Sequence, residues 1–219
     1  MEHLQGTNKI TGPHQGQPVL AAGEPLERAK AAMIMIHGRG ASAEDILSLA
    51  NEVNQPGFTY LAPQAAGYSW YPQSFLAPLA NNEPGISSGL AVIAALFERL
   101  TGAGIGPERT ILLGFSQGAC LSLEFASRNA RRYGGVAGLS GGLIGPDGTK
   151  RDYPGSLQGT PIFLGCSERD MHIPKERVQF SSEVLHRQGG RVTARLYPHM
   201  GHTVNDDELE AVRAMMAAL

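Results

Sequence analysis

Short apolar segments recur along the chain and alternate with longer segments in which apolar residues follow a helical spacing. Strands are predicted at residues 19–22, 32–36, 58–62, 111–113, 136–139, 161–165 and 191–197. Helices are predicted between them, at residues 42–51, 86–100, 119–126, 175–187 and 206–219. Uninterrupted apolar runs are typical of strands that are buried on both faces of a parallel sheet. The alternation therefore predicts crossover units in a mostly parallel sheet of about seven strands, with helices on both faces and an antiparallel outer first strand.

The chain is predicted to form one domain that follows an irregular leader. Residues 1–17 are rich in glycine, proline, glutamine and threonine and show little periodicity, so they form the predicted leader, and residues 18–219 form the domain. His14 lies in this polar leader with no evident partner and is expected to be solvated. No insertion is long enough to fold separately as a large cap domain.

Composition and charge exclude several classes of protein. Only 17% of the residues are charged and the net charge is −2, which leaves no electrostatic footprint for nucleic acid or an anionic membrane surface. The first residues have no basic start or apolar core, and no apolar run approaches the roughly 20 residues that span a bilayer. We therefore expect a cytoplasmic protein without stable membrane insertion, which acts on a small molecule. Cys120 and Cys166 lie in apolar segments and are expected to be buried thiols.

A serine between two glycines marks the change from the strand at 111–113 to the following helix. Ser116 stands between Gly114 and Gly118, and a serine at the tip of so tight a turn has a strained backbone that leaves no room for a neighbouring Cβ. The turn exposes the serine hydroxyl at the edge of the sheet. It also aims the first amides of the helix, that of Gln117 first, at any anion that forms there.

A serine nucleophile needs a base, and the base needs an acid that orients it. His202 follows the last predicted strand and is the preferred base, because Gly201 beside it permits an unusual loop backbone; His199 in the same loop is the competitor. Asp170 follows the strand at 161–165 and is the preferred acid, with Glu168 as second choice. The resulting chain order of Ser, Asp and His is the order expected for an α/β-hydrolase.

An acyl-transfer site also needs donors for the oxyanion. One is the Gln117 amide, and we expect the Arg39 amide, in the loop 37–40 after an early central strand, to be the other. His37 is expected to fix this loop by hydrogen bonding rather than to act as a second base. The Arg39 side chain has two interpretations: it favours substrates with an anionic group near the scissile ester, or it faces solvent and contributes only its amide.

The segment from Gln64 to Pro84 contains Trp70, Tyr71 and Phe75 among glycine, proline and asparagine. Loops of this length in a compact domain are usually lids or binding loops, so these aromatic residues are candidates for substrate binding; the alternative is a packed surface loop. Exposed apolar residues around Phe75 and Leu76 could serve a homodimer or a substrate groove.

Taken together, these motifs resemble the phospholipase/carboxylesterase family of α/β-hydrolases, which includes acyl-protein thioesterases and small bacterial carboxylesterases. The resemblance runs from about residue 31 to the end and rests on residues 37–40, Trp70, residues 114–118, Asp170 with Pro174, and Gly201 with His202. It implies a serine hydrolase without metal or organic cofactor, a triad of Ser116, Asp170 and His202, and an acyl site lined by Trp70. The better-known thioesterases carry Leu-Gly-Asp after the His-Gly, whereas this chain has Arg39-Gly40-Ala41, which argues against lysophospholipid or acyl-protein substrates.

The sequence thus predicts a serine carboxylesterase that hydrolyses short- to medium-chain carboxylic esters through an acyl-enzyme. An acyl thioesterase or lysophospholipase is the alternative within the enzyme class. A non-catalytic binding module with the same fold is the alternative of another class.

Overall fold

A computed structural model describes residues 11–219, so residues 1–10 of the predicted leader lie outside the described residues. Its centre is a seven-stranded sheet in the order β1-β3-β2-β4-β5-β6-β7. The strands are β1 (Val19–Gly23), β2 (Ala31–Ile36), β3 (Phe58–Pro63), β4 (Thr110–Phe115), β5 (Gly135–Leu139), β6 (Pro161–Ser167) and β7 (Arg191–Tyr197). The edge strand β1 pairs antiparallel with β3, and every other pair is parallel. The predicted sheet is therefore confirmed.

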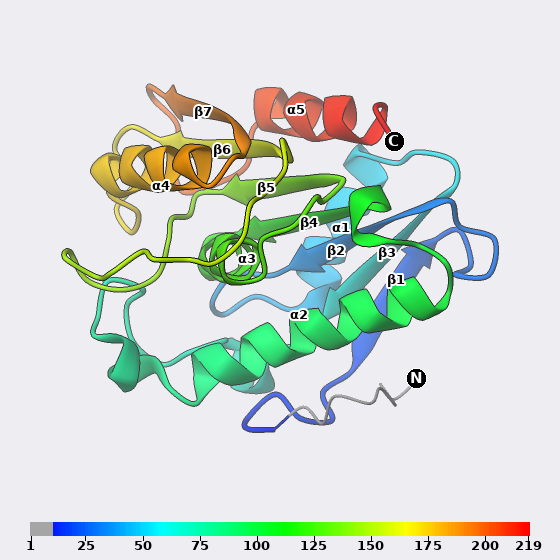
Figure 1. Cartoon of the computed structure of the whole chain (residues 1–219), viewed down its shortest axis with the longest axis horizontal. Coiled ribbons are helices and arrows are strands. Elements are labelled where there is room, and N and C mark those ends of the chain that lie inside the picture. Colours follow the sequence, from blue (N-terminus) through cyan, green and yellow to red (C-terminus); the bar gives the residue numbers. More distant parts are fainter. Residues whose placement is uncertain (1–10) are drawn as a thin grey trace.

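Helices cover both faces of this sheet (Figure 1). They are α1 (Ala43–Glu52), α2 (Gly85–Gly102), α3 (Gln117–Arg128), α4 (Lys175–Arg187) and α5 (Asp206–Met216). Short 3-10 turns occur at η1 (Ala66–Tyr68), η2 (Leu79–Asn82) and η3 (Pro107–Arg109). Within residues 11–219 no connection between strands folds as a separate cap domain, as the sequence predicted.

Side chains that alternate along the central strands build two apolar cores. On β2, Ile34 packs into the core beneath α2, α3 and α4, whereas its neighbour Met33 points to the opposite core, beneath α1 and α5. All six residues of β2 are buried for this reason. The central strands are thus held from both sides, and the loops at their carboxyl ends start from fixed positions.

The prediction that His14 is solvated is wrong. Its side chain is buried against Trp70, with 5.0 Å between ring centroids. The Ala66 amide donates to its Nδ1 at 3.1 Å, so Nε2 carries the proton and donates to the Trp70 carbonyl at 2.9 Å. Burial lowers the pKa of His14, which keeps the ring neutral and Nδ1 available as an acceptor. The partners lie more than fifty positions away in the chain, so no local pattern indicated them.

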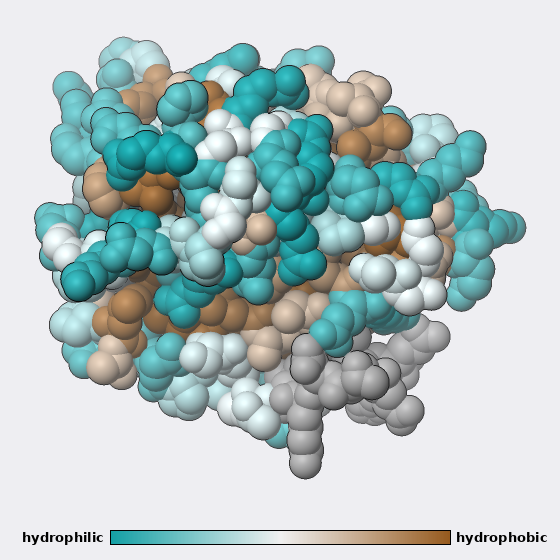
Figure 2. Space-filling view, in the orientation of Figure 1, coloured by the Kyte–Doolittle hydropathy of each residue, from teal (hydrophilic) through white to brown (hydrophobic). Residues whose placement is uncertain are grey.

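The surface of the described residues is predominantly polar. Figure 2 shows hydrophilic side chains over most of one face, with apolar residues gathered in smaller areas between them. The exposed large apolar side chains in residues 11–219 are Tyr68, Met171, Phe180 and Leu219. No helix in this part of the chain combines the length and the apolar character needed to cross a membrane.

Candidate active site

Ser116 occupies the turn between β4 and α3 in a backbone conformation that side chains rarely adopt, with φ 53° and ψ −117°. The two flanking glycines are needed for steric reasons. A Cβ at Gly114 would lie 2.3 Å from the Gly118 carbonyl oxygen, and one at Gly118 would lie 2.1 Å from the Ile36 carbonyl oxygen. Because these neighbours are backbone atoms, neither contact could be relieved by turning a side chain.

The three residues expected to form a triad are joined by hydrogen bonds. Nε2 of His202, in the loop after β7, lies 2.8 Å from Oγ of Ser116. Its Nδ1 lies 2.7 Å from Oδ2 of Asp170, in the loop after β6. An ionised carboxylate only accepts hydrogen bonds, so Nδ1 carries the proton and Nε2 is left to accept from the serine hydroxyl. The competitors His199 and Glu168 are exposed.

Asp170 is held as a carboxylate, although its side chain has no exposed surface. Burial raises its pKa, but hydrogen bonds from His202 and from the backbone amides of His172 and Ile173 more than offset this, so the pKa lies below its usual value. The two amides donate to Oδ1 at 2.8 and 3.1 Å. The second oxygen, Oδ2, is therefore directed at His202.

Two residues that line the cleft, Arg39 and Gln117, carry backbone amides without a protein acceptor among the described residues. Gln117 is the first residue of α3, where amides have no partner within the helix. Arg39 follows β2, which lies next to β4 in the sheet. Among the described residues, neither amide donates a hydrogen bond to a protein acceptor, and both residues line the cleft. Both amides are therefore unpaired, and their role as oxyanion donors stays a prediction.

His37 is buried and fixes the loop that carries the Arg39 amide. The Ala65 amide donates to its Nε2 at 3.0 Å, so Nδ1 carries the proton and donates to the Gly38 carbonyl at 2.7 Å. Burial lowers the pKa of His37 and keeps it neutral. Both ring nitrogens are thus occupied by backbone groups, in agreement with the expected role of fixing the loop.

The cleft in front of Ser116 has a volume of about 410 Å³. It is lined by Arg39, Tyr71, Pro72, Gln73, Ser74, Phe75, Ser116, Gln117, Cys120, His172, Ile173 and His202. The aromatic segment thus contributes Tyr71 and Phe75 to its wall, and their role in substrate binding stays a prediction. Phe75 is only 6% exposed, so the expectation that it forms an exposed apolar patch is wrong.

Trp70 does not line the cleft, contrary to what the family resemblance implied. It is 0% exposed, and its indole Nε1 donates to the His37 carbonyl at 2.9 Å. A buried indole needs an acceptor, and Trp70 finds it in the loop 37–40 rather than in the cleft. Trp70 therefore packs against this loop, while its neighbour Tyr71 lines the cleft.

The side chain of Gln117 has a role that the sequence reasoning missed. Its Oε1 accepts from the Trp70 amide at 2.8 Å, and its Nε2 donates to the Tyr71 carbonyl at 2.8 Å. This amide therefore fastens the aromatic segment to the start of α3. The available signal was an amide side chain directly after Ser116, at the start of an otherwise apolar helix.

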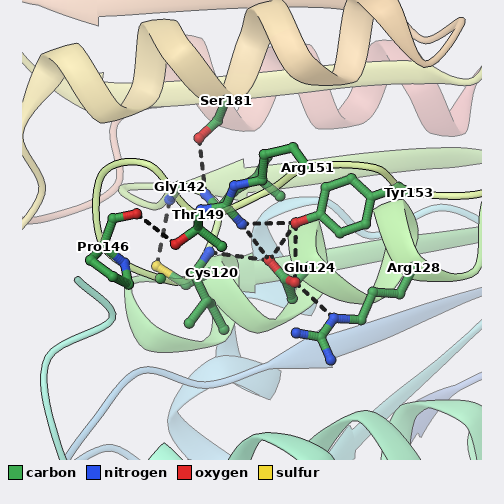
Figure 3. A network of polar contacts seen from close by, with 12 residues as sticks. Cys120, Glu124, Arg128, Gly142, Pro146, Thr149, Arg151, Tyr153 and Ser181 are labelled. Carbon is green, nitrogen blue, oxygen red and sulfur yellow. Dashed lines mark hydrogen bonds and ion pairs between the residues drawn. The ribbon is translucent and has the colours of Figure 1, made fainter. Parts of the chain in front are cut away.

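A buried carboxylate, also missed, anchors the loop after β5 (Figure 3). Glu124 on α3 is 2% exposed and accepts from Arg128 at 2.7 Å, from the Tyr153 hydroxyl at 3.1 Å and from Arg151 at 3.4 Å. The Ile144 amide donates to it at 3.2 Å. This loop also reaches the cleft wall, because the amide that follows Ile144 donates to the Phe75 carbonyl at 2.7 Å. The signal was a single glutamate in an apolar helix.

Within residues 11–219 no group of three or more histidine, cysteine or carboxylate side chains is arranged to hold a metal ion. Cys120 and Cys166 are free and buried, and burial raises the pKa of each thiol to about 12. The expectation of buried thiols is confirmed, and neither thiol is activated as a nucleophile.

Known proteins resemble this chain in sequence and in fold. A crystal structure of a phospholipase/carboxylesterase from Dyadobacter fermentans superposes with a TM-score of 0.90, at 38% identity over 95% of this chain and 99% of that chain. Acyl-protein thioesterase 1 of Emericella nidulans is 29% identical over 211 residues, which are 84% of this chain and 88% of that protein. The protein of the same name from Gibberella zeae is 35% identical over 124 residues, which span 55% of this chain and about half, 52%, of that relative.

These proteins share the α/β-hydrolase fold of this chain, and the family they represent unites carboxylesterases and thioesterases. The model of the family described as Phospholipase/Carboxylesterase matches residues 19–219, which is nearly the whole described chain. The chain therefore belongs to the phospholipase/carboxylesterase family of serine hydrolases.

Proposed function

We propose that this protein is a serine carboxylesterase that hydrolyses short- to medium-chain carboxylic esters. The observation that carries the proposal is the continuous hydrogen-bonded chain from Asp170 through His202 to Ser116, which ends in an open cleft. Hydrogen bonds that only stabilise the fold do not require a strained serine backbone or two unpaired amides beside the serine. Their coincidence with the hydrogen-bonded chain supports a catalytic role over a binding module.

In the proposed reaction, Ser116 Oγ attacks the ester carbonyl carbon while its proton passes to His202 Nε2. Asp170 stabilises the resulting imidazolium and keeps its orientation. The amides of Arg39 and Gln117 donate to the oxyanion, and each such donor is worth about 3 to 4 kcal/mol of transition-state stabilisation. His202 then protonates the leaving alcohol, an acyl-enzyme remains, and a water activated by the same histidine releases the acid.

The preference for short and medium acyl groups rests on the walls of the cleft. Tyr71, Phe75 and Ile173 are buried side chains packed into the core, so they form a fixed boundary rather than a flexible one. A cleft of about 410 Å³ must hold the acyl and alcohol parts of a substrate together. An acyl thioesterase is the second candidate, favoured by the similarity to proteins named acyl-protein thioesterase 1.

The test is hydrolysis of p-nitrophenyl acetate, butyrate, octanoate and palmitate by the wild type and by Ser116→Ala. The control variant is Ser122→Ala, because Ser122 is also buried on α3 but its hydroxyl makes no hydrogen bond. We expect turnover in the wild type and the control, highest for the shorter chains, and none in Ser116→Ala. Equal turnover in all three proteins would refute the assignment of Ser116 and favour the binding module.

The length of the acyl chain and the choice between ester and thioester distinguish a carboxylesterase from a thioesterase. Rates that rise toward palmitate would contradict the short-chain preference. A butyryl thioester that is cleaved with a much higher kcat/KM than the matching butyrate ester would favour the thioesterase.

A further inference from the structure

The Arg39 side chain reaches across the cleft wall and binds three consecutive carbonyl groups. Its Nη2 donates to the Tyr71 carbonyl at 2.9 Å and to the Gln73 carbonyl at 2.6 Å, and its Nη1 donates to the Pro72 carbonyl at 2.9 Å. The guanidinium carbon also lies 6.0 Å from the centre of the Tyr71 ring. The Arg39 guanidinium thus binds the backbone of residues 71–73, so these contacts do not depend on most of the side chains in that turn.

These contacts leave no two-donor edge free for an anionic substrate. A guanidinium binds a carboxylate bidentately through Nη2 paired with either Nε or Nη1. Both hydrogens of Nη2 are used by the carbonyls of Tyr71 and Gln73. A substrate carboxylate could form such a pair only by displacing the protein's own backbone.

The charge of Arg39 is accommodated by carbonyl dipoles and by the Tyr71 ring, without a carboxylate partner among residues 11–219. Within residues 11–219 no carboxylate lies within ion-pair distance of it, and none is among the residues that line the cleft. A nearby acid would compete with the three carbonyls for the same donors. Its absence leaves the guanidinium committed to the segment 71–73.

The two residues with free amides beside Ser116 hold the same carbonyl oxygen. Gln117 Nε2 donates to the Tyr71 carbonyl at 2.8 Å, and Arg39 Nη2 donates to it at 2.9 Å. Ser69 Oγ donates to it as well, at 2.9 Å. Hydrogen bonds to the Tyr71 carbonyl therefore link the cleft wall to the loop after β2 and to the start of α3.

We propose that the Arg39 side chain is a positioning residue: together with Gln117 it fixes the segment 69–73 against the two oxyanion amides. It therefore sets the shape of the oxyanion site and the cleft wall together, for neutral and anionic esters alike. This replaces the interpretation of Arg39 as an anion-recognising residue. Arg39 is exposed, as the second interpretation expected, but its guanidinium binds backbone carbonyls, so it contributes more than its amide. The proposal rests on the proposed esterase function for its kinetic test, but its spectroscopic test does not.

The kinetic test compares Arg39→Ala and Arg39→Lys with the wild type on two esters of matched length, p-nitrophenyl valerate and the mono-p-nitrophenyl ester of glutaric acid. Removing the guanidinium takes a charged donor from three carbonyls, so we expect kcat/KM to fall about 10- to 100-fold for both esters by the same factor. Lysine should restore part of the loss, and so should added methylguanidinium with Arg39→Ala. A loss confined to the glutarate ester would overturn the proposal in favour of anion recognition.

The spectroscopic test uses Trp70, the single tryptophan of the chain, which lies buried inside the fixed segment. We expect its emission to shift to longer wavelength and its quenching by acrylamide to increase in Arg39→Ala. The control is Arg28→Ala, because Arg28 is an exposed arginine that forms only a surface ion pair with Glu24. Emission and quenching unchanged from the control would refute the proposal.

The two tests fail in different ways. If the wild type hydrolyses no ester, the proposed function is wrong while Trp70 still reports whether Arg39 holds the segment. If the wild type is an esterase and Arg39→Ala keeps full activity and native fluorescence, the positioning role alone is wrong.

Discussion

Substitution of Glu124 by glutamine should cost this protein a large part of its stability. The glutamate is 2% exposed, and its partner Arg151 is also buried, with 7% of its side chain exposed. Glutamine keeps the shape and one acceptor oxygen but leaves the Arg151 cation without a counter-charge in the interior. Two nitrogens of Arg151, Nε and Nη2, have no hydrogen-bond partner among the described residues, so no other contact at these atoms offsets the loss of the Glu124 charge.

The expected magnitude follows from that arrangement. Removing one partner of a buried ion pair costs about 3–5 kcal/mol, and the retained acceptor oxygen places Glu124→Gln near the lower end, at about 3 kcal/mol. A domain of this kind is stable by about 5–15 kcal/mol, so about a fifth to three fifths of its stability is at stake. At about 2–4 °C per kcal/mol, Tm should fall by about 6–12 °C.

The assay is urea unfolding followed by circular dichroism, with Glu183→Gln on the exposed face of α4 as control. The double variant Glu124→Gln/Arg151→Met should recover part of the loss, because it removes the unpaired cation. A stability of Glu124→Gln within about 0.5 kcal/mol of the control would show that the buried charge is not what holds this loop.

Further predictions concern the serine turn and the response to pH. Gly118→Ala would place a methyl group 2.1 Å from the Ile36 carbonyl oxygen, so we expect kcat/KM to fall at least about 100-fold. The control is Gly102→Ala, where an added methyl group would meet no atom within 4 Å, so kcat/KM should stay unchanged. Equal activities of the two variants would refute the steric argument. Burial lowers the pKa of His14 and His37 below 6.5, so the unfolded chain binds more protons and their contribution to the free energy of unfolding is lost as pH falls below about 6.5. Burial raises the pKa of Glu208 from 4.5 to about 7, so its contribution has the opposite sign: it is full below pH 4.5 and is lost as pH rises through about 7. Glu208→Gln should therefore raise Tm at pH 8. It should also make Tm fall more steeply between pH 7.5 and 5.5, because the glutamate no longer offsets the loss from the two histidines. Thermal melts of the variant that match the wild type at these pH values would contradict the pKa directions assigned to Glu208 and to the histidines.

The sequence predicted what depends on local chemistry. The strands and helices follow from apolar spacing, and the turn at Ser116 is indicated by two glycines in a five-residue motif. Asp170 and His202 could be chosen because both follow strands whose carboxyl ends meet at one edge of a parallel sheet. The distances from Asp170 to His202 and from His202 to Ser116 agree with that choice, although the sequence contained no distance.

The sequence could not predict side-chain contacts between residues that are far apart in the chain, because these contacts depend on how the elements pack. His14 and Trp70 contact each other across more than fifty residues, and neither has a local pattern that names the other. Arg39 was expected to recognise an anion or to contribute only its amide, whereas its exposed side chain binds three backbone carbonyls. The residue types that provide those carbonyls do not indicate this contact. Hydrogen bonds to the backbone are independent of side-chain identity, so such contacts become visible only with the fold.

The close approach of Gly118 to the Ile36 carbonyl has a consequence for how this protein can diversify. Any amino-acid replacement at that glycine adds atoms against the neighbouring strand, so we expect the turn to tolerate no variants while activity is under selection. The segment 71–73, in contrast, is held through carbonyl oxygens, which every amino acid supplies. New substrate preferences can therefore arise by replacing side chains at positions such as Gln73 without disturbing the reacting groups, because the fastening is made by the backbone.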